Sequence, residues 1–216
     1  LTASLVRRAE ASGYTALMLT VDLAVVGNRR RDALHRFTLP PGLHQANLPL
    51  DMPATGESGL VAYAEDQFDP SVAYSELEKL VGSTSLPVVV KGVIRGDDAV
   101  ACVDAGAAAV VVSNHGARQL DTCIATADAL TEVVAATAGS VPVAVDGGVR
   151  SGTDVVKALA MGASTVLVGR PFLWGLALGG AEGVAAVAAA FRVELERAMA
   201  LCGAASVAEV GFDLLV

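Results

Sequence analysis

Hydrophobic and polar positions follow one another along the chain in a pattern that predicts repeated strand–helix units. Short runs that are continuously apolar, each ending in a polar residue or a glycine, are typical of strands buried in a parallel sheet. Segments with apolar residues on one face, several of them ending at a glycine, predict helices between these runs. We expect strands at residues 16–21, 87–91, 109–113, 142–146 and 165–168, and helices at 2–12, 74–82, 97–105, 125–138, 151–161, 172–178 and 181–202.

This order of elements predicts an α/β fold made of parallel βαβ units. No strong dinucleotide-binding fingerprint follows the first expected strand, so a (β/α)₈ TIM barrel fits better than a doubly wound sheet. Five strands cannot close a barrel of eight. We therefore expect residues 1–216 to form the C-terminal portion of a single barrel domain, about strands 4 to 8, with the N-terminal part absent.

The stretch from about 28 to 75 interrupts the regular pattern. It is polar, carries five of the eight prolines and shows no sustained period. We expect a long excursion with little regular structure, because loops of this length in a compact domain are usually lids or binding loops.

Composition narrows the class of protein. The net charge of −8 argues against nucleic acid as a partner, since phosphate binding needs a basic face. Three scattered cysteines without metal-ligand spacing indicate a reducing compartment and no metal site. Charged residues interrupt every apolar run before the ~18 positions of a membrane span, and no secretory leader precedes them. We expect a soluble intracellular protein, cytoplasmic or peroxisomal, although its C-terminus lacks the Ser-Lys-Leu peroxisomal signal.

Every expected strand ends in residues that can do chemistry. In (β/α)₈ enzymes, the carboxyl ends of the strands form the active face. Taken singly, these residues have simpler explanations: Asp146 could cap a helix, and Lys91 could be a solvated strand end. Together they indicate one functional face. The residues are Thr20 and Asp22; Lys91; Ser113, Asn114 and His115; Asp146, Gly147 and Gly148; Gly169 and Arg170.

The last two strand ends indicate a phosphate site. The sequences DGGVRSG at 146–152 and GR at 169–170 each combine glycine with an arginine at the start of a helix. Glycine lets backbone N–H groups approach an anion, the helix N-terminus adds a favourable dipole, and arginine supplies a fork of donors. Loops after strands seven and eight commonly bind phosphate in such barrels. The alternative is two glycine-rich turns with surface arginines.

The third strand end is a candidate catalytic loop. His115 can titrate near neutrality and is a plausible general base. Arg118, three residues later, could hold a carboxylate in a two-pronged contact. A histidine in a loop is more often structural, but its position beside Arg118 on this face favours catalysis.

With these residues identified, the chain resembles a known family. SNHGARQLD at 113–121 matches the signature around the active-site histidine of FMN-dependent 2-hydroxy-acid oxidases and dehydrogenases. The resemblance extends from residue 2 to about 209 through LTVD at 19–22, GNR at 27–29, LPVVVKG at 86–92, DGGVR at 146–150 and VGRP at 168–171. Details around Ala117 and LPP at 39–41 resemble the glycolate oxidase branch most. Leu23 and Ala24 depart from the family's common Thr-Pro, and Val25 replaces a larger side chain.

The resemblance implies a role for each site residue and a reaction. His115 would be the base and Asp22 its hydrogen-bonded partner, while Arg118 and Arg29 would bind the substrate carboxylate. Lys91 would stabilise the reduced flavin, and Thr20 and Ser113 would hydrogen-bond its ring. The ribityl chain and phosphate of FMN would be held by Asp146, Gly148, Arg150, Gly169 and Arg170. The family reaction is oxidation of a small (S)-2-hydroxy acid to the 2-oxo acid, and residues 36–75 would be its variable loop.

Several features stay open at this point. The sequence does not say which 2-hydroxy acid is bound, whether O₂ or another molecule accepts the electrons, or whether the carbon-bound hydrogen leaves as a proton or a hydride. The branch resemblance favours an oxidase that yields H₂O₂, and the family resemblance implies a homotetramer. The alternatives are an inactive or partner-dependent truncated form of such an enzyme, and a different FMN- or phosphate-binding barrel enzyme. The second alternative leaves His115 with Arg118, and Asp22 with Arg29, unexplained.

Overall fold

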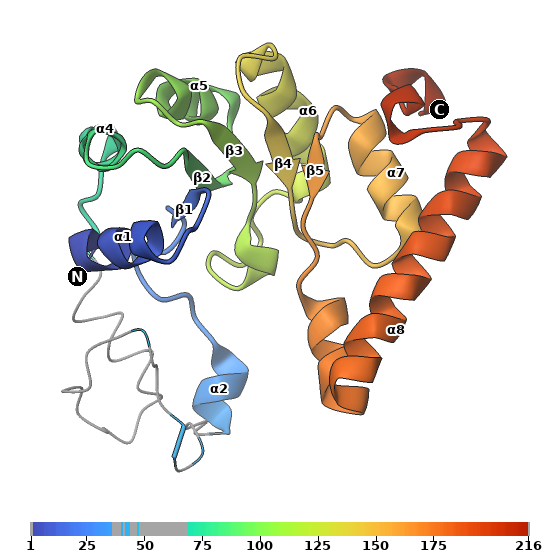
Figure 1. Ribbon diagram of the computed structural model, residues 1–216, viewed down its shortest axis with the longest axis horizontal. Helices are drawn as coiled ribbons and strands as arrows, with labels where there is room; N and C mark the ends of the chain where they lie inside the picture. The colour runs from blue at the N-terminus through green and yellow to red at the C-terminus, as the bar shows by residue number, and fades with distance from the viewer. Residues whose placement is uncertain (1, 36–39, 41, 44–46, 48–68, 216) are drawn as a thin grey trace.

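The computed structural model describes residues 2–35, 40, 42–43, 47 and 69–215. Within them, five strands form one parallel sheet whose spatial order follows the chain order. The strands are β1 (Leu17–Thr20), β2 (Val88–Val93), β3 (Ala109–Val112), β4 (Val143–Val145) and β5 (Thr165–Val166). Because all four pairings are parallel, the carboxyl ends of the strands lie along the same edge (Figure 1).

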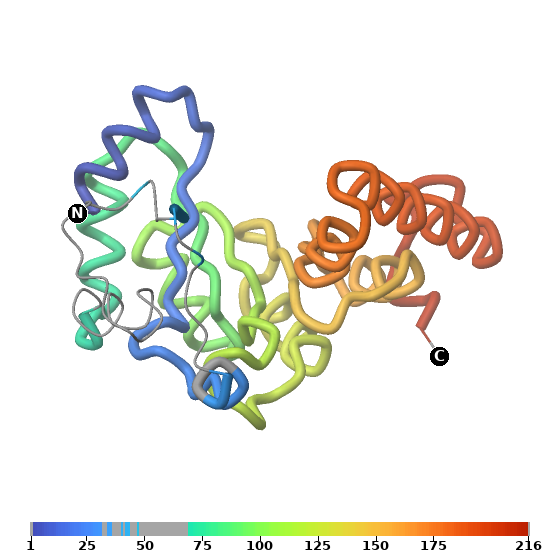
Figure 2. Tube along the Cα trace, turned by 90° about the horizontal axis from the view of Figure 1, so that it is seen from below, coloured from blue at the N-terminus to red at the C-terminus, as the bar shows by residue number. Residues whose placement is uncertain are grey.

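Helices connect the strands and cover one face of the curved sheet (Figure 1). The α-helices are α1 (Thr2–Ala11), α2 (Arg30–Leu34), α4 (Tyr74–Gly82), α5 (Gly96–Asp104), α6 (Thr126–Thr137), α7 (Gly152–Ala160) and α8 (Arg170–Cys202). Three 3₁₀ turns complete the described elements: η1 (His115–Ala117), η2 (Val207–Glu209) and η3 (Phe212–Leu214). Seen from below, α7 and α8 lie together at one end of the molecule (Figure 2).

The main core lies between the sheet and helices α4 to α6. Valines of β2, β3 and β4 are almost fully buried against apolar helix residues. Burying a valine or leucine side chain stabilises the fold by about 1.5–3 kcal/mol, so this layer is the main source of stability for the strand ends. The residues that contribute most are Leu77, Val88, Val90, Val110, Val112, Leu130, Val133, Val143 and Val145.

The structure confirms the predicted alternation of strands and helices and refines three details. The predicted helices at 172–178 and 181–202 are the two arms of α8, which is broken where Gly179 and Gly180 leave helical geometry and folds back on itself (Figure 1). Strand β5 ends two residues earlier than predicted. The stretch 28–75, predicted to be irregular, contains the short helix α2; most of the predicted variable loop 36–75 lies outside the described residues.

Among the described helices, only α8 is long and apolar enough, by length and composition, to cross a membrane. The break at Gly179 and Gly180 divides it, and the longer arm carries Glu182, Arg192 and Glu194. Because α8 folds back on itself, it forms a helical hairpin that packs on α7, and it does not form one continuous span.

Candidate active site

The parallel register brings the predicted chemical residues to one edge of the sheet. Thr20 at the end of β1 pairs with Lys91 of β2, and Lys91 pairs with Val111 of β3. Ser113 and Asp146 directly follow β3 and β4. A β-bulge between Lys91 and Val93, at Gly92 with φ of 113°, bends β2 here. The strands alone therefore place side chains from distant parts of the sequence side by side.

The loop after β3 has an unusual backbone that aims the histidine. His115, Gly116 and Ala117 all have positive φ values, 56°, 65° and 59°. Left-handed conformations are costly for residues with a Cβ atom, so a run of three must be held by its surroundings. The Asn114 side chain accepts a hydrogen bond from the Ala117 N–H at 3.2 Å, and the Ser113 hydroxyl accepts one from the His115 N–H at 3.1 Å.

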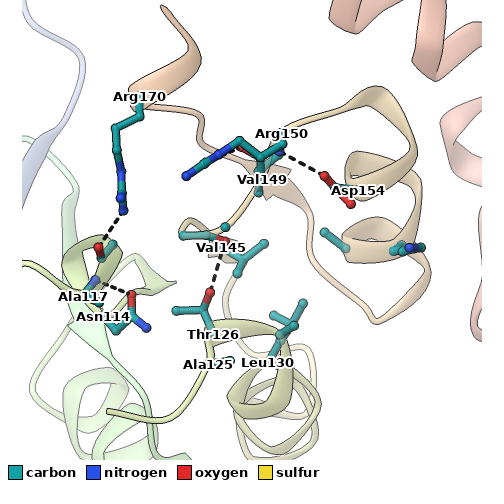
Figure 3. Close-up of a pocket in the computed structure, with 16 residues that line it drawn as sticks. Asn114, Ala117, Ala125, Thr126, Leu130, Val145, Val149, Arg150, Asp154 and Arg170 are labelled. Atoms are coloured by element: carbon teal, nitrogen blue, oxygen red, sulfur yellow. Dashed lines mark hydrogen bonds between the residues drawn. The ribbon is translucent and has the colours of Figure 1, made fainter. Parts of the chain in front are cut away.

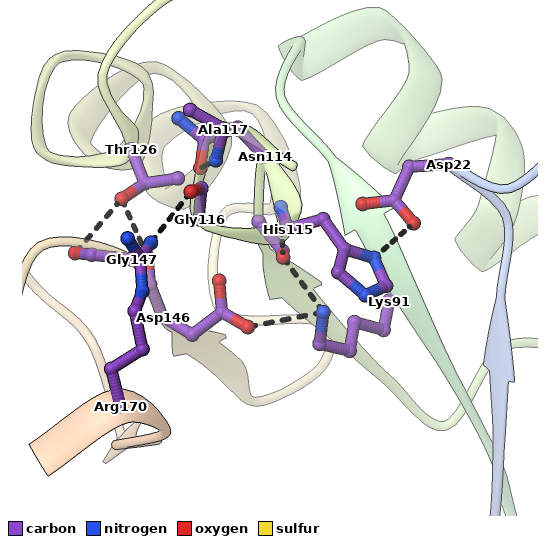
Figure 4. A network of polar contacts seen from close by, with 11 residues as sticks. Asp22, Lys91, Asn114, His115, Gly116, Ala117, Thr126, Asp146, Gly147 and Arg170 are labelled. Carbon is purple, nitrogen blue, oxygen red and sulfur yellow. Dashed lines mark hydrogen bonds and ion pairs between the residues drawn. The ribbon is translucent and has the colours of Figure 1, made fainter. Parts of the chain in front are cut away.

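The imidazole of His115 meets a carboxylate from the loop after β1. Nδ1 of His115 lies 3.0 Å from Oδ1 of Asp22, which is 93 residues away in the chain (Figure 4). Because an ionised carboxylate can only accept, this contact favours the tautomer with the proton on Nδ1. Nε2 is then the ring nitrogen that can take a proton from a bound molecule.

A cation lies beside this pair. Nζ of Lys91 donates to the hydroxyl of Ser113 at 2.8 Å and forms an ion pair with Oδ2 of Asp146 at 3.1 Å (Figure 4). The side chains of Lys91 and Asp146 are only 14% and 17% exposed, so solvent screens their charges weakly. Ser113 is fully buried and joins the lysine to the His115 loop.

A cavity of about 450 Å³ lies between the loops after β4 and β5, and Asn114, Gly116 and Ala117 of the loop after β3 also line it. Arg150 and Arg170 extend towards it from the two loops (Figure 3), and Gly147, Gly148 and Thr126 line it as well. Arg170 donates to the carbonyl oxygen of Gly116 at 2.6 Å, which connects the loop after β5 to the loop that carries His115. The cation of Arg150 also lies over the ring of Trp174, 5.2 Å from its centre.

A capping box holds the β4 loop. The Ser151 hydroxyl accepts from the Asp154 N–H, and the Asp154 carboxylate accepts from the N–H groups of Arg150 and Ser151 at 2.9 and 3.1 Å. Partial burial of Asp154 disfavours its charge, but these hydrogen bonds outweigh burial and lower the pKa of its carboxyl below the ordinary value of 3.8. The helix start and the backbone of Arg150 are thus fixed by local contacts.

The two candidate carboxylate-binding arginines are less constrained. Arg118 is exposed, and Arg29 is half-buried. The Nε of Arg29 is buried and has no hydrogen-bond partner in the described part of the chain. Both arginines belong to the loops that carry Asp22 and His115.

Two polar residues take part in the site without having been given a role from the sequence: Asn114, which was placed on the functional face, and Thr126, which was not. Thr126, at the start of α6, donates through its hydroxyl to the carbonyl of Asp146 at 2.5 Å. Asn114 donates to the carbonyl of Ile124 at 3.1 Å as well as accepting from Ala117. Asn114 stood within the quoted motif; Thr126 has no signal in the sequence beyond its place at a helix start.

Known proteins resemble this chain over its whole length. The family model described as FMN-dependent dehydrogenase matches residues 1–216. An L-lactate oxidase of Nostoc sp. is 52% identical over 100% of this chain and 60% of its own length. Glycolate oxidase 1 of Oryza sativa subsp. indica is 48% identical over 95% of this chain and 57% of its own. Human 2-hydroxyacid oxidase 1 is 47% identical over 95% and 58%.

Among solved structures, a crystal structure of mandelate oxidase with (S)-4-hydroxymandelic acid superposes with a TM-score of 0.91 and 43% sequence identity. It covers 96% of this chain and 59% of that protein. The chain therefore spans somewhat more than half the length of the relatives it matches. The predicted fold class, an α/β part of a (β/α)₈ barrel, is confirmed.

The residues present fit FMN, the cofactor of this family. Oδ1 of Asp146 is buried without a hydrogen-bond partner in the described residues, as expected of an acceptor for a ribityl hydroxyl. A Cβ atom on Gly148 or Gly169 would meet open space, so both backbones are accessible to a phosphate. Arg150 and Arg170 supply positive charge at the cavity beside these glycines, and Lys91 supplies positive charge at the end of β2. With a family model that matches every residue, the chain belongs to the family of FMN-dependent 2-hydroxy-acid oxidases and dehydrogenases.

Proposed function

We propose that this protein oxidises a small (S)-2-hydroxy acid to the corresponding 2-oxo acid, with FMN as cofactor and O₂ as the final acceptor. One observation carries the proposal: the His115–Asp22 pair lies on the same sheet edge as the Lys91–Asp146 ion pair, and Ser113 connects them. A base and a partly buried cation are therefore held at fixed places around one site.

His115 would act as the base through Nε2. Oxidation of a hydroxy acid removes two protons and two electrons, and a base must accept a proton as the carbonyl forms. Asp22, 3.0 Å from Nδ1, would stabilise the imidazolium that results. When bound, FMN would supply two-electron redox chemistry, by which the two electrons and two protons removed from the hydroxy acid reduce O₂ to H₂O₂.

Arg118 and Arg29 would bind the substrate carboxylate. Arginine forms two parallel hydrogen bonds with a carboxylate, which orients the hydroxyl-bearing carbon as well as binding it. The unpartnered Nε of Arg29 is a donor suited to this role. The substrate class agrees with the lactate, glycolate and mandelate named for the relatives.

Lys91 would stabilise negative charge on the reduced flavin, and Thr20 and Ser113 would hydrogen-bond its ring. A cation that is 14% exposed and already oriented by Asp146 needs no rearrangement when charge develops nearby. Asp146, Gly148, Arg150, Gly169 and Arg170 would hold the ribityl chain and the phosphate. The homotetramer and the intracellular location stay predictions from the resemblance and the sequence.

The test is substrate oxidation by the FMN-loaded protein. With L-lactate, glycolate or (S)-mandelate in air, we expect equal amounts of 2-oxo acid and H₂O₂, and formation of both about 10³-fold slower with His115→Ala. If turnover requires an artificial electron acceptor and does not occur with O₂, the protein is a dehydrogenase and not an oxidase. Tightly bound FMN without oxidation of any 2-hydroxy acid by either route would contradict the proposal.

A further inference from the structure

Two loops far apart in the sequence form the catalytic side of the site. The β1 loop, residues 21–29, carries Asp22 and Arg29. The β3 loop, residues 113–119, carries His115 and Arg118. Their geometry depends on how one loop docks on the other, because each pair of residues with a shared role is divided between them. The Asp22–His115 contact is a single hydrogen bond and cannot fix this docking alone.

The first docking contact is made by Gln119. Its Nε2 donates to the carbonyl oxygen of Val25, 2.9 Å away and 94 residues earlier in the chain. This bond joins the end of the β3 loop to the middle of the β1 loop. Val25 lies between Asp22 and Arg29, so one side chain from the β3 loop restrains the segment that carries both.

The second contact is made by the backbone of Gly27. A Cβ atom at this position would lie 2.6 Å from Cα of Gln119 and closer still to the carbonyl oxygen of Arg118. Real Cβ atoms do not approach other atoms so closely, so only glycine permits this docking. Gly27 is not among the residues with positive φ, which means that close approach, not backbone conformation, requires the glycine.

A shared cavity marks the same junction. Gly27, Gln119 and Asp22 all line a space of about 340 Å³ between the two loops and the end of β2. The remaining lining is mostly apolar, including Val25, Ile94 and Leu120. No other side-chain hydrogen bond among the described residues joins residues 21–29 to residues 113–119, apart from Asp22–His115 and Gln119–Val25.

We propose that Gln119 and Gly27 are positioning residues that clamp the β1 loop to the β3 loop and thereby set the Asp22–His115 and Arg29–Arg118 geometry. Neither residue touches the reacting atoms in this account. The kinetic part of its test rests on the proposed function, whereas the spectroscopic part does not. A displacement of about 1 Å at a catalytic group can cost about 100-fold in rate, so a loosened clamp should be measurable.

The spectroscopic test uses ¹⁵N NMR of the imidazoles, at a pH where they are neutral, with and without FMN. The chain has three histidines, of which His35 is exposed and serves as an internal reference. We expect wild-type His115 to show a proton on Nδ1 and a bare Nε2. In Gln119→Met and Gly27→Ala, its signals should move towards the mixed tautomers of His35.

The kinetic test uses the same variants with L-lactate. We expect kcat/KM to fall about tenfold in Gln119→Met and about 100-fold in Gly27→Ala. KM should rise because the arginines are misaligned, and kcat should fall because Asp22 leaves His115. The Kd for FMN should stay within about twofold, since neither Gln119 nor Gly27 is among the proposed cofactor-binding residues.

Matched controls separate the clamp from general effects. Ser83→Ala removes another side-chain hydrogen bond to a backbone carbonyl, 2.8 Å long, at the exposed end of α4. Gly82→Ala adds a Cβ atom that meets open space. Both controls should match wild type in the NMR and kinetic measurements.

Two results would overturn the inference: an unchanged His115 tautomer in both clamp variants, or kcat/KM values equal to wild type in an active enzyme. If the wild-type protein oxidises no hydroxy acid, the proposed function fails instead, and the NMR result alone decides whether the clamp exists.

Discussion

The two halves of the site are held together in different ways. The phosphate half, formed by the loops after β4 and β5, depends mainly on local contacts: Ser151 and Asp154 cap α7 and fix the backbone of Arg150. The catalytic half, formed by the loops after β1 and β3, depends on contacts that span 93 and 94 residues. The backbone at Arg150 is therefore held by its neighbours in the sequence. The catalytic half needs the assembled sheet, and so does Arg170, whose hydrogen bond to Gly116 spans 54 residues.

This difference indicates which substitutions should disturb the geometry of each half. Local caps and glycine turns tolerate distant changes, because their geometry is set by neighbours in the sequence. Loop docking is sensitive to any change that alters the spacing of the strands beneath. Substitutions should therefore separate cofactor binding from turnover.

Removing the base should give the largest effect. In His115→Ala, we expect kcat for L-lactate to fall about 10³-fold, because general-base catalysis commonly contributes this much. The Kd for FMN should stay close to wild type, since the hydrogen bonds of His115 to the described residues go to Ser113 and Asp22 and not to Arg150 or Arg170. Steady-state kinetics measures kcat, and flavin titration measures the Kd for FMN. A His115→Ala variant that loses FMN binding as well as turnover would contradict the division of the site into two halves.

Crowding Asp22 should give an intermediate effect. A Cβ atom at Gly92 would lie 2.8 Å from Cβ of Asp22, and Gly92 also has φ of 113°. In Gly92→Ala, we expect kcat/KM to fall about 100-fold as Asp22 is displaced from His115. The control is Gly139→Ala, which also sits at positive φ but meets no atom within 4 Å. Equal losses of activity in the two variants would assign the effect to backbone strain alone.

Removing a phosphate-half cation should weaken FMN binding and spare turnover. Arg170→Ala deletes a charged donor towards the phosphate, so we expect the Kd for FMN to rise about tenfold, equivalent to about 1.4 kcal/mol. At saturating FMN, kcat should fall less than about threefold. Fluorescence quenching of FMN measures the Kd. A large loss of kcat would mean that the Arg170–Gly116 contact shapes the catalytic loop.

The smallest effect is on stability and its pH dependence. Asp154→Asn should cost about 1 kcal/mol at neutral pH, because the capping box loses its charged acceptor. Since folding lowers the pKa of Asp154, its contribution is present above the unfolded value near 3.8 and disappears as pH falls through the lower folded value. Urea unfolding of wild type and variant should therefore converge in acid. A difference that grows below about pH 4 would contradict this sign.

Much of the fold follows from the sequence because each strand is a continuous apolar run and several helices end at a glycine. The break in α8 was visible as two helical segments separated by Gly179 and Gly180. The short helix α2 was not predicted, since five residues are too few to show a helical period. The end of β5 shifted because strand ends depend on pairing, which single-chain patterns do not show.

For the site, the sequence was most informative where chemistry is local. The glycine–arginine loops after β4 and β5 pointed to an anion from residue types alone. Asp22 was joined to His115 only through the family resemblance, because no spacing rule relates residues 93 positions apart. The docking function of Gly27 and Gln119 was not predicted, since a close backbone approach becomes visible only in three dimensions.

The most direct test of the account is an anaerobic titration of the FMN-loaded protein with L-lactate, followed by the flavin absorbance. Wild type and FMN-saturated Arg170→Ala should lose their yellow colour, whereas His115→Ala should bind FMN and stay yellow for the time in which wild type bleaches. Flavin in His115→Ala that bleaches as fast as in wild type would contradict the central claim that the β1–β3 half performs the chemistry and the β4–β5 half holds the cofactor.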